Sequence, residues 1–274
     1  MHPSKLLPLA SQEYGLCQMT VCIAALADNG KSAVICSDKM KTRNVGGMTF
    51  QDDDDEHRKI FSLPNGTFVL TAGDESYASD AINAALPLID ATTTFEQAAE
   101  HIRGAFAKRR IEIIVQEHIT NRGIGTLDDY FQKHISLPQT ITAAIDNAFM
   151  QCNVGQTEFL IVGKDASDIF HVWRITQLAT IYRHDETGFC CMGSGAVNAM
   201  TVMMEPEYKK NLSVARVHSI VERAKRASEI VAGVGKKTDI VDLPIVSDET
   251  VQELVQSVVS ARQTPSDPAG EQHA

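Results

Sequence analysis

The chain has 274 residues, 43% hydrophobic and 22% charged, so it is long enough to bury one large core or two smaller ones. Its formal net charge of −10 argues against a nucleic-acid partner, because phosphate binding needs a concentrated basic surface. No apolar run approaches the roughly 18–20 residues that span a bilayer, and the start of the chain is too broken a pattern for a signal peptide.

The first half of the chain reads as strands followed by helices. Apolar, β-prone runs bounded by turn residues predict four strands, at residues 20–27, 32–37, 58–63 and 67–72. An apolar stripe predicts a helix over 76–90. The pair Thr94 and Gln97 is a capping-box start for a helix that continues to about Ile119.

In the second half, the predicted order is a helix, a second group of strands, further helices and a last strand. A helix is expected over 138–152, and helices are expected again over 196–205 and 213–231. Five further strands are predicted, at 157–163, 168–174, 178–183, 188–192 and 238–246. Strands, a helix pair, strands and then helices suit an α+β fold of two stacked antiparallel sheets with helices outside.

The segment from Met19 to Asp38 carries the first chemical signal. Thr20 begins the first predicted strand, and Asp38 ends the second. Loss of everything up to Met19 leaves Thr20 with a free α-amine. A threonine whose own amine is its base is a recognised way to activate a hydroxyl nucleophile.

This segment resembles the start of a proteasome-type β subunit, a member of the N-terminal-nucleophile hydrolases. Three further pieces follow in the family's order: the strand Arg58–Leu63, Thr71–Asp74 with Gly73 fourteen residues after Lys59, and the Gly-Ser-Gly turn in Met192–Ala196. The ordered set covers roughly residues 20–245. The Met-Thr-x-Cys opening is most similar to the bacterial ancestral β-subunit branch. The resemblance implies a four-layer αββα sandwich of two antiparallel sheets flanked by helices.

The resemblance also implies site roles. Thr20 is the nucleophile, and Lys59 lowers the pKa of its α-amine, which is ordinarily about 7.7–8.0, by like-charge repulsion. Asp38 supplies the counter-charge of Lys59. The N–H of Gly73 serves as oxyanion donor, and Ser194 orients the amine. No metal or cofactor is expected.

Each residue also has a plainer interpretation. Thr20 is also a β-branched strand former, and Asp38 and Lys59 would also suit an ordinary surface ion pair. Gly73 would also suit an ordinary turn between a strand and a helix. Ser194 would also suit the N-cap of the helix that follows it.

Some positions depart from the family. Eighteen residues separate Thr20 from Asp38, two more than usual, which we attribute to a longer turn at 28–32. Met19 stands where processed subunits carry glycine, which favours Met19 as the initiator. The family's late Asp and Ser are poorly matched, and three nearby residues stay unassigned: Ser228, Glu229 and Asp239.

The expected domain organisation follows. Residues 1–19 are a leader or a mis-assigned start that is removed, 20–262 form a single hydrolase domain, and 263–274 are a flexible tail. A helical insertion at about 91–155 exceeds the family's helix pair. It carries more apolar residues than one helix face needs: Ile102, Phe106, Ile113, Ile114, Val115, Ile119 and Phe131.

Three other patterns favour ordinary structural roles. Six cysteines without Cys-x-x-Cys spacing indicate small buried hydrophobes in a reducing compartment, which predicts a cytoplasmic location. The acidic run 52–56 is expected to be a solvated loop. The segment 233–238 lacks the spacing of a phosphate loop.

The sequence therefore predicts an N-terminal threonine hydrolase that cleaves peptide or other amide bonds through a covalent acyl-enzyme. Two alternatives stay open: a structural subunit that assembles without cleaving, and a small-amide hydrolase of the same fold. The expected partners are a peptide or protein substrate and further copies of the chain, with part of 91–155 between subunits. The sequence identifies no ATPase or unfoldase partner.

Overall fold

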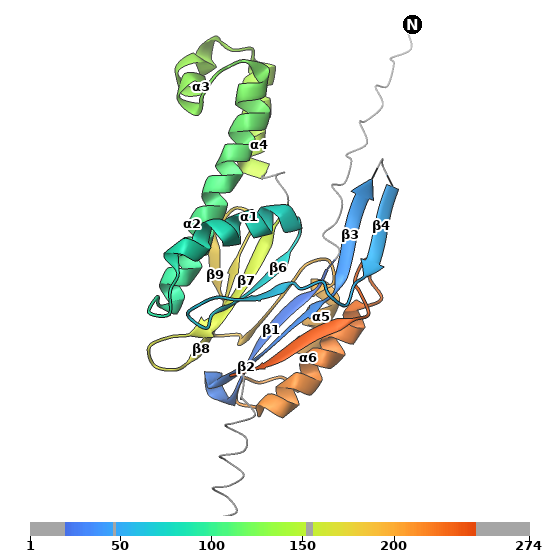
Figure 1. The fold of residues 1–274 in the computed structure, drawn as a ribbon. Coiled ribbons are helices and arrows are strands. Elements are labelled where there is room, and N and C mark those ends of the chain that lie inside the picture. Colours follow the sequence, from blue (N-terminus) through green and yellow to red (C-terminus); the bar gives the residue numbers. More distant parts are fainter. Residues whose placement is uncertain (1–19, 46–47, 152–155, 245–274) are drawn as a thin grey trace, which may run out of the picture.

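The computed structural model describes residues 20–45, 48–151 and 156–244, and this part has a mixed α/β fold (Figure 1). It contains three antiparallel sheets and six α-helices. The predicted leader at 1–19 and the predicted tail at 263–274 lie outside the described residues.

The first sheet carries both ends of the Thr20–Asp38 segment. Its strands have the order β10-β1-β2-β11. Their bounds are β1 Cys22–Ala27, β2 Ser32–Asp38, β10 Phe189–Met192 and β11 Thr238–Leu243. Cys22 lies opposite both Ser37 and Met192, so the start of β1 meets the ends of its two neighbours. The expected turn at 28–32 is a short 3-10 turn, Asp28–Gly30, in which Asn29 has a positive φ of 58°.

The second sheet has the order β5-β6-β7-β8-β9. Its strands are β5 Ile60–Ser62, β6 Phe68–Ala72, β7 Glu158–Lys164, β8 Phe170–Ile175 and β9 Ile181–Arg183. The central strands read as nearly continuous apolar runs because both of their faces are covered. Alternate residues of β6 show this: Val69 faces one buried cluster and Leu70 faces another.

Three apolar clusters hold these elements together. One joins the first sheet to helices α5 (Ala196–Met203) and α6 (Val214–Ser228). A second joins the second sheet to α1 (Glu75–Ala85) and α2 (Phe95–Ile114). The third lies between the two sheets and includes Cys22, Leu70 and Leu160.

The insertion forms an arm that projects from the body (Figure 1). Helix α2 runs past the second sheet into a π turn at Val115–Ile119, and α3 (Leu127–Lys133) and α4 (Gln139–Gln151) complete the arm. Most apolar residues that suggested a subunit interface are buried within the chain. Ile102 and Phe106 pack on the second sheet, while Ile114 and Ile119 belong to clusters that include residues of α4. Phe131 is the member of that set that is exposed, at 59%.

The sequence-based prediction missed one hairpin and one helix. Strands β3 (Met40–Val45) and β4 (Met48–Asp53) pair as a separate two-stranded sheet, and α3 was not expected. The acidic run was expected to be solvated, but its first residues end β4. Asp53 accepts hydrogen bonds from the backbone N–H groups of Lys236 (2.8 Å) and Lys237 (3.2 Å), which attaches the hairpin to the segment before β11.

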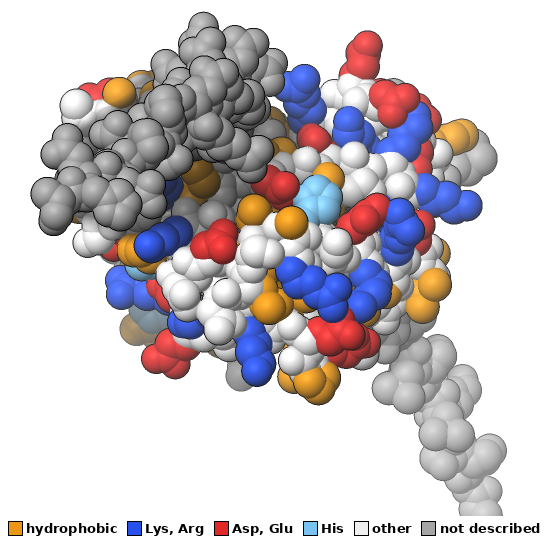
Figure 2. Space-filling model, turned by 90° about the horizontal axis from the view of Figure 1, so that it is seen from below, with side chains coloured by type: hydrophobic (Ala, Val, Ile, Leu, Met, Phe, Trp, Pro, Cys, Tyr) orange, Lys and Arg blue, Asp and Glu red, His pale blue; other side chains and the backbone are white. Residues whose placement is uncertain are grey.

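Acidic and basic side chains are interspersed on the face seen in Figure 2. This face therefore offers no continuous basic surface. Among the helices of the described part, none combines the length and apolar character that a membrane span needs.

A histidine between two carboxylates stabilises the outer part of the second sheet. His171 on β8 lies 3.1 Å from Asp185 and 3.2 Å from Asp165, and its ring stacks on Phe95. Burial alone would lower the pKa of His171, but the nearby carboxylates of Asp185 and Asp165 outweigh it and raise the pKa above its ordinary value.

We predict that His171→Gln is destabilising at acidic pH and much less so at alkaline pH. A folded-state pKa above the unfolded value contributes stability below the unfolded pKa, and that contribution is lost as pH rises through the folded pKa. Urea unfolding of both proteins at pH 5.5, 7 and 8.5 measures the difference. A difference that grows with pH would contradict this assignment.

Candidate active site

The predicted nucleophile lies at the junction of the two sheets. Thr20 precedes β1 and is 3% exposed. Its hydroxyl donates a short hydrogen bond to Oδ1 of Asp38 and accepts one from Nζ of Lys59 at 2.5 Å. Lys59 Nζ also donates to Asp38 Oδ1 at 2.9 Å. The three side chains therefore form a closed triangle.

Asp38 is the centre of this arrangement. It ends β2, is fully buried, and receives five donors. Three reach Oδ1, namely the Thr20 hydroxyl, Val21 N–H at 2.9 Å and Lys59 Nζ. Two reach Oδ2, namely Met40 N–H at 3.0 Å and Gly235 N–H at 3.1 Å. A buried carboxylate with this many donors is satisfied in its hydrogen bonding and held in one position.

Lys59 enters from the other sheet. It immediately precedes β5 and is 7% exposed. Its backbone oxygen accepts a hydrogen bond from Thr71 N–H on β6 at 3.0 Å. This bond fixes the position of Lys59 relative to β6. Because the ammonium is buried, the carboxylate of Asp38 is needed as its counter-charge.

The Gly-Ser-Gly turn holds the backbone of Thr20. Ser194 Oγ accepts from Thr20 N–H at 3.2 Å and lies 3.3 Å from the Thr20 carbonyl oxygen. Gly195 N–H donates to the same carbonyl oxygen at 3.1 Å. Gly193 has a φ of 89°, and a Cβ on it would meet that oxygen at 2.4 Å. Gly193 is therefore required for the turn to approach Thr20 so closely.

Of the three late residues left unassigned by sequence, Ser228 is connected to this turn. It is fully buried on α6, and its hydroxyl donates to the Gly195 carbonyl at 3.0 Å. Glu229 pairs instead with Lys225 at 2.6 Å, and Asp239 lies opposite Ser37 in the sheet.

Gly73 lies at the end of β6, directly before Asp74, which caps α1. Its φ of 105° suits glycine, and a Cβ would meet the carbonyl oxygen of Gln156 at 2.5 Å. Gly73 and Thr20 both line a pocket of about 210 Å³. The structure therefore brings the five predicted residues to one place: Thr20, Asp38, Lys59, Gly73 and Ser194.

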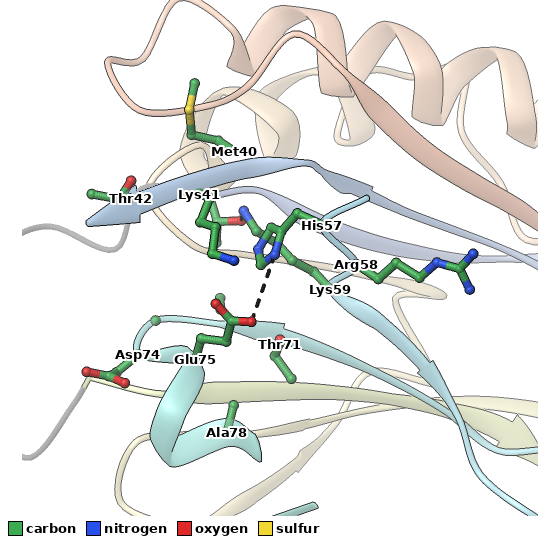
Figure 3. A pocket seen from close by; sticks show the side chains of 13 residues that line it. Met40, Lys41, Thr42, His57, Arg58, Lys59, Thr71, Asp74, Glu75 and Ala78 are labelled. Carbon is green, nitrogen blue, oxygen red and sulfur yellow. Dashed lines mark hydrogen bonds and ion pairs between the residues drawn. The ribbon is translucent and has the colours of Figure 1, made fainter. Parts of the chain in front are cut away.

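The pocket contains polar side chains that no sequence motif indicated (Figure 3). His57 lies 3.9 Å from Glu75 of α1, and Lys41 of β3 also lines the pocket. Burial lowers the pKa of His57, and the neighbouring ammonium groups of Lys59 and Lys41 lower it further, against the opposing effect of Glu75. These effects together favour the neutral form of the His57 imidazole.

The nearest thiol is not a competing nucleophile. Cys22 lies two residues after Thr20, and burial raises its pKa far above the ordinary value. A thiol that stays protonated is unreactive. The described residues hold no group of three or more His, Cys, Asp or Glu side chains arranged for a metal ion.

The fold is similar to that of a solved structure described as "Anbu (Gly-1) mutant from Hyphomicrobium sp. strain MC1". The TM-score is 0.54, and the match covers 92% of this chain and 100% of that chain at 13% sequence identity. Anbu is an ancestral bacterial proteasome β-subunit. At this identity the likeness concerns the fold alone. No protein-family model matches the chain, and no curated protein matches it.

We predict that the Asp38–Lys59 pair is strongly coupled in stability. Asp38→Asn leaves a buried ammonium without its counter-charge, which costs about 3–5 kcal/mol, and Lys59→Met should cost a similar amount. The double variant should lose much less than the sum, because no uncompensated charge remains. Urea unfolding of the four proteins measures the coupling.

The exposed pair Lys237–Asp55, at 2.8 Å, is the matched control for this cycle. Its single and double variants should change stability little, because solvent screens the two charges. Additive losses in the Asp38–Lys59 cycle would contradict the pairing.

Proposed function

We propose that this chain is an N-terminal threonine hydrolase that cleaves peptide or other amide bonds. The observation that carries the proposal is the Thr20 hydroxyl held between a buried carboxylate and a buried ammonium, with the Thr20 nitrogen at Ser194. The fold likeness to Anbu supports the same class. We further propose that the two larger sheets and their helices form the four-layer αββα sandwich of N-terminal-nucleophile hydrolases within a single domain, residues 20–262.

The base in this proposal is the nitrogen of Thr20. In the full chain it is a peptide N–H that donates to Ser194 Oγ. After removal of the residues up to Met19, the same atom is an amine with a lone pair. Its ordinary pKa of about 7.7–8.0 is already near neutral, and the Lys59 ammonium favours the uncharged form.

The reaction then needs only groups already in place. The amine takes the hydroxyl proton as Thr20 Oγ1 bonds to the carbonyl carbon of the substrate. The Gly73 N–H stabilises the oxyanion. As the C–N bond breaks, the amine returns its proton to the leaving nitrogen, which leaves an ester on Thr20. A water molecule, deprotonated by the same amine, hydrolyses that ester and restores the hydroxyl.

We predict that the purified active protein begins at Thr20 and that Thr20→Ala abolishes hydrolysis without unfolding the protein. Thr20→Ser should keep part of the activity, because it preserves both the hydroxyl and the α-amine. Intact mass gives the first residue, and a panel of fluorogenic peptide amides gives the rates.

Two outcomes would overturn this proposal. Full turnover by Thr20→Ala would exclude Thr20 as nucleophile. A folded, purified protein whose Thr20 stays in peptide linkage to Met19 would favour the alternative of a structural subunit. Activity on small amides but on no peptide would instead indicate the small-amide hydrolase.

We also propose that the chain assembles with copies of itself through the arm. Three large apolar side chains at the outer end of the arm, on α3, α4 and the turn between them, are exposed: Phe131, Ile135 and Met150. Ile135 is 88% exposed and Phe131 is 59% exposed, so both side chains are accessible to a second copy of the chain. A contact between different surfaces of identical subunits closes into rings or grows into filaments.

The double variant Phe131→Glu/Ile135→Glu should convert the assembly into monomers of about 30 kDa, because it places charges in the contact. Light scattering at micromolar concentration measures the mass. The control Leu178→Glu alters another exposed apolar side chain, 48% exposed and outside the arm. A parent protein that is already monomeric would remove the assembly proposal.

A further inference from the structure

A second cavity lies at the open edge of the first sheet, away from Thr20. Strand β10 is the last strand of that sheet, paired with β1 on one side only. Between it, the end of α5 and the loop after α5 is an apolar groove of about 710 Å³. Apolar side chains line most of it: Phe189, Met200, Met203, Met204 and Tyr208.

The groove leaves apolar surface uncovered. Met204 is 71% exposed and Met200 is 38% exposed, although both lie beside the buried Met203. Methionine is flexible and polarisable, so it adapts to apolar partners of varied shape. Contiguous exposed apolar surface of this kind marks an interaction site.

A segment of the same chain has the matching pattern. Residues 248–262 lie outside the described part, and their sequence is Asp-Glu-Thr-Val-Gln-Glu-Leu-Val-Gln-Ser-Val-Val-Ser-Ala-Arg. Its large apolar residues recur at the spacing of one helix face: Val251, Leu254, Val255, Val258 and Val259. A segment with one apolar face needs an apolar surface to cover it.

The described chain ends close enough for this segment to reach the groove. Leu243 of β11 lies opposite Ala33, Ala33 lies opposite Leu26, and Leu26 N–H bonds the Gly188 carbonyl beside the groove. This row crosses the sheet in three strand spacings, about 14 Å. The eight residues from Leu243 to Val251 reach up to about 26–29 Å when extended. The reach of these eight residues is therefore longer than the distance across the sheet, so the chain could pass around the end of the strands.

The charges are complementary as well. The segment from 248 to 259 holds three acidic residues and no basic residue. Lys209 lines the groove, whereas the two other charged residues there are already paired: Arg174 with Glu158 at 2.7 Å and Glu205 with Arg223 at 2.9 Å. An acidic segment is therefore favoured over a basic one.

We propose that residues 248–262 cover this groove in the same chain, with their apolar residues packed against the methionines of α5. This proposal does not depend on hydrolysis by Thr20.

Disulfide trapping in the full-length protein tests this contact. Under mild oxidation, Met204→Cys combined with Val255→Cys should form an intramolecular disulfide, detected by intact mass and non-reducing electrophoresis. The control pair Met204→Cys with Gln256→Cys places its second thiol on the opposite side of the predicted helix and should cross-link far less. Disulfides found only between two chains would assign the groove to a second copy and overturn the proposal.

Limited trypsin digestion is the second measurement. Met204→Glu should release the segment and raise the rate of cleavage after Arg262 at least tenfold. Ile230→Glu is the matched control, because Ile230 is 83% exposed and is not among the groove's lining residues. Equal cleavage rates in the parent and both variants, together with no intramolecular disulfide, would exclude the proposal.

Discussion

The buried carboxylate of Asp38 is the interaction on which the site depends. Its donors come from the start of β1, the start of β3, the residue before β5 and the segment before β11. One charged group thus fixes the relative positions of four parts of the chain. The ammonium of Lys59 balances its charge, and the same ammonium contacts the Thr20 hydroxyl. The Asp38–Lys59 pair therefore has two roles: it holds parts of the chain together, and it contacts the hydroxyl of Thr20.

The sequence predicted those elements whose signal is local. The central strands were recognisable because burial on both faces leaves continuous apolar runs, and the capping box at Thr94 and Gln97 is confirmed in α2. The hairpin β3–β4 was missed because its sequence is polar and ends in acidic residues. It is attached to the body by backbone N–H groups that donate to Asp53, and a pattern of apolar residues cannot indicate such a contact.

The grouping of the site residues was predictable only through the family resemblance. Thr20 lies 18 residues from Asp38, 39 from Lys59 and 174 from Ser194, and no spacing rule joins such positions. His57 gave no signal at all, since a single histidine beside charged residues is common on any surface. In the arm, the sequence signal was strong but its interpretation was incomplete. The many apolar residues suggested a contact between subunits, and most of them pack within the chain.

The long separation between Thr20 and its partners also sets when the site forms. Strand β1 lies between β2 and β10, and Asp38 gains its last donor from Gly235 near the end of the described chain. Each of these contacts closes a long loop, at a cost in conformational entropy that the other native contacts have to offset. On the ribosome, the first strand is therefore synthesised long before its sheet is completed. The hydroxyl of Thr20 cannot be oriented in a nascent or half-folded chain, so folding itself controls when this site exists.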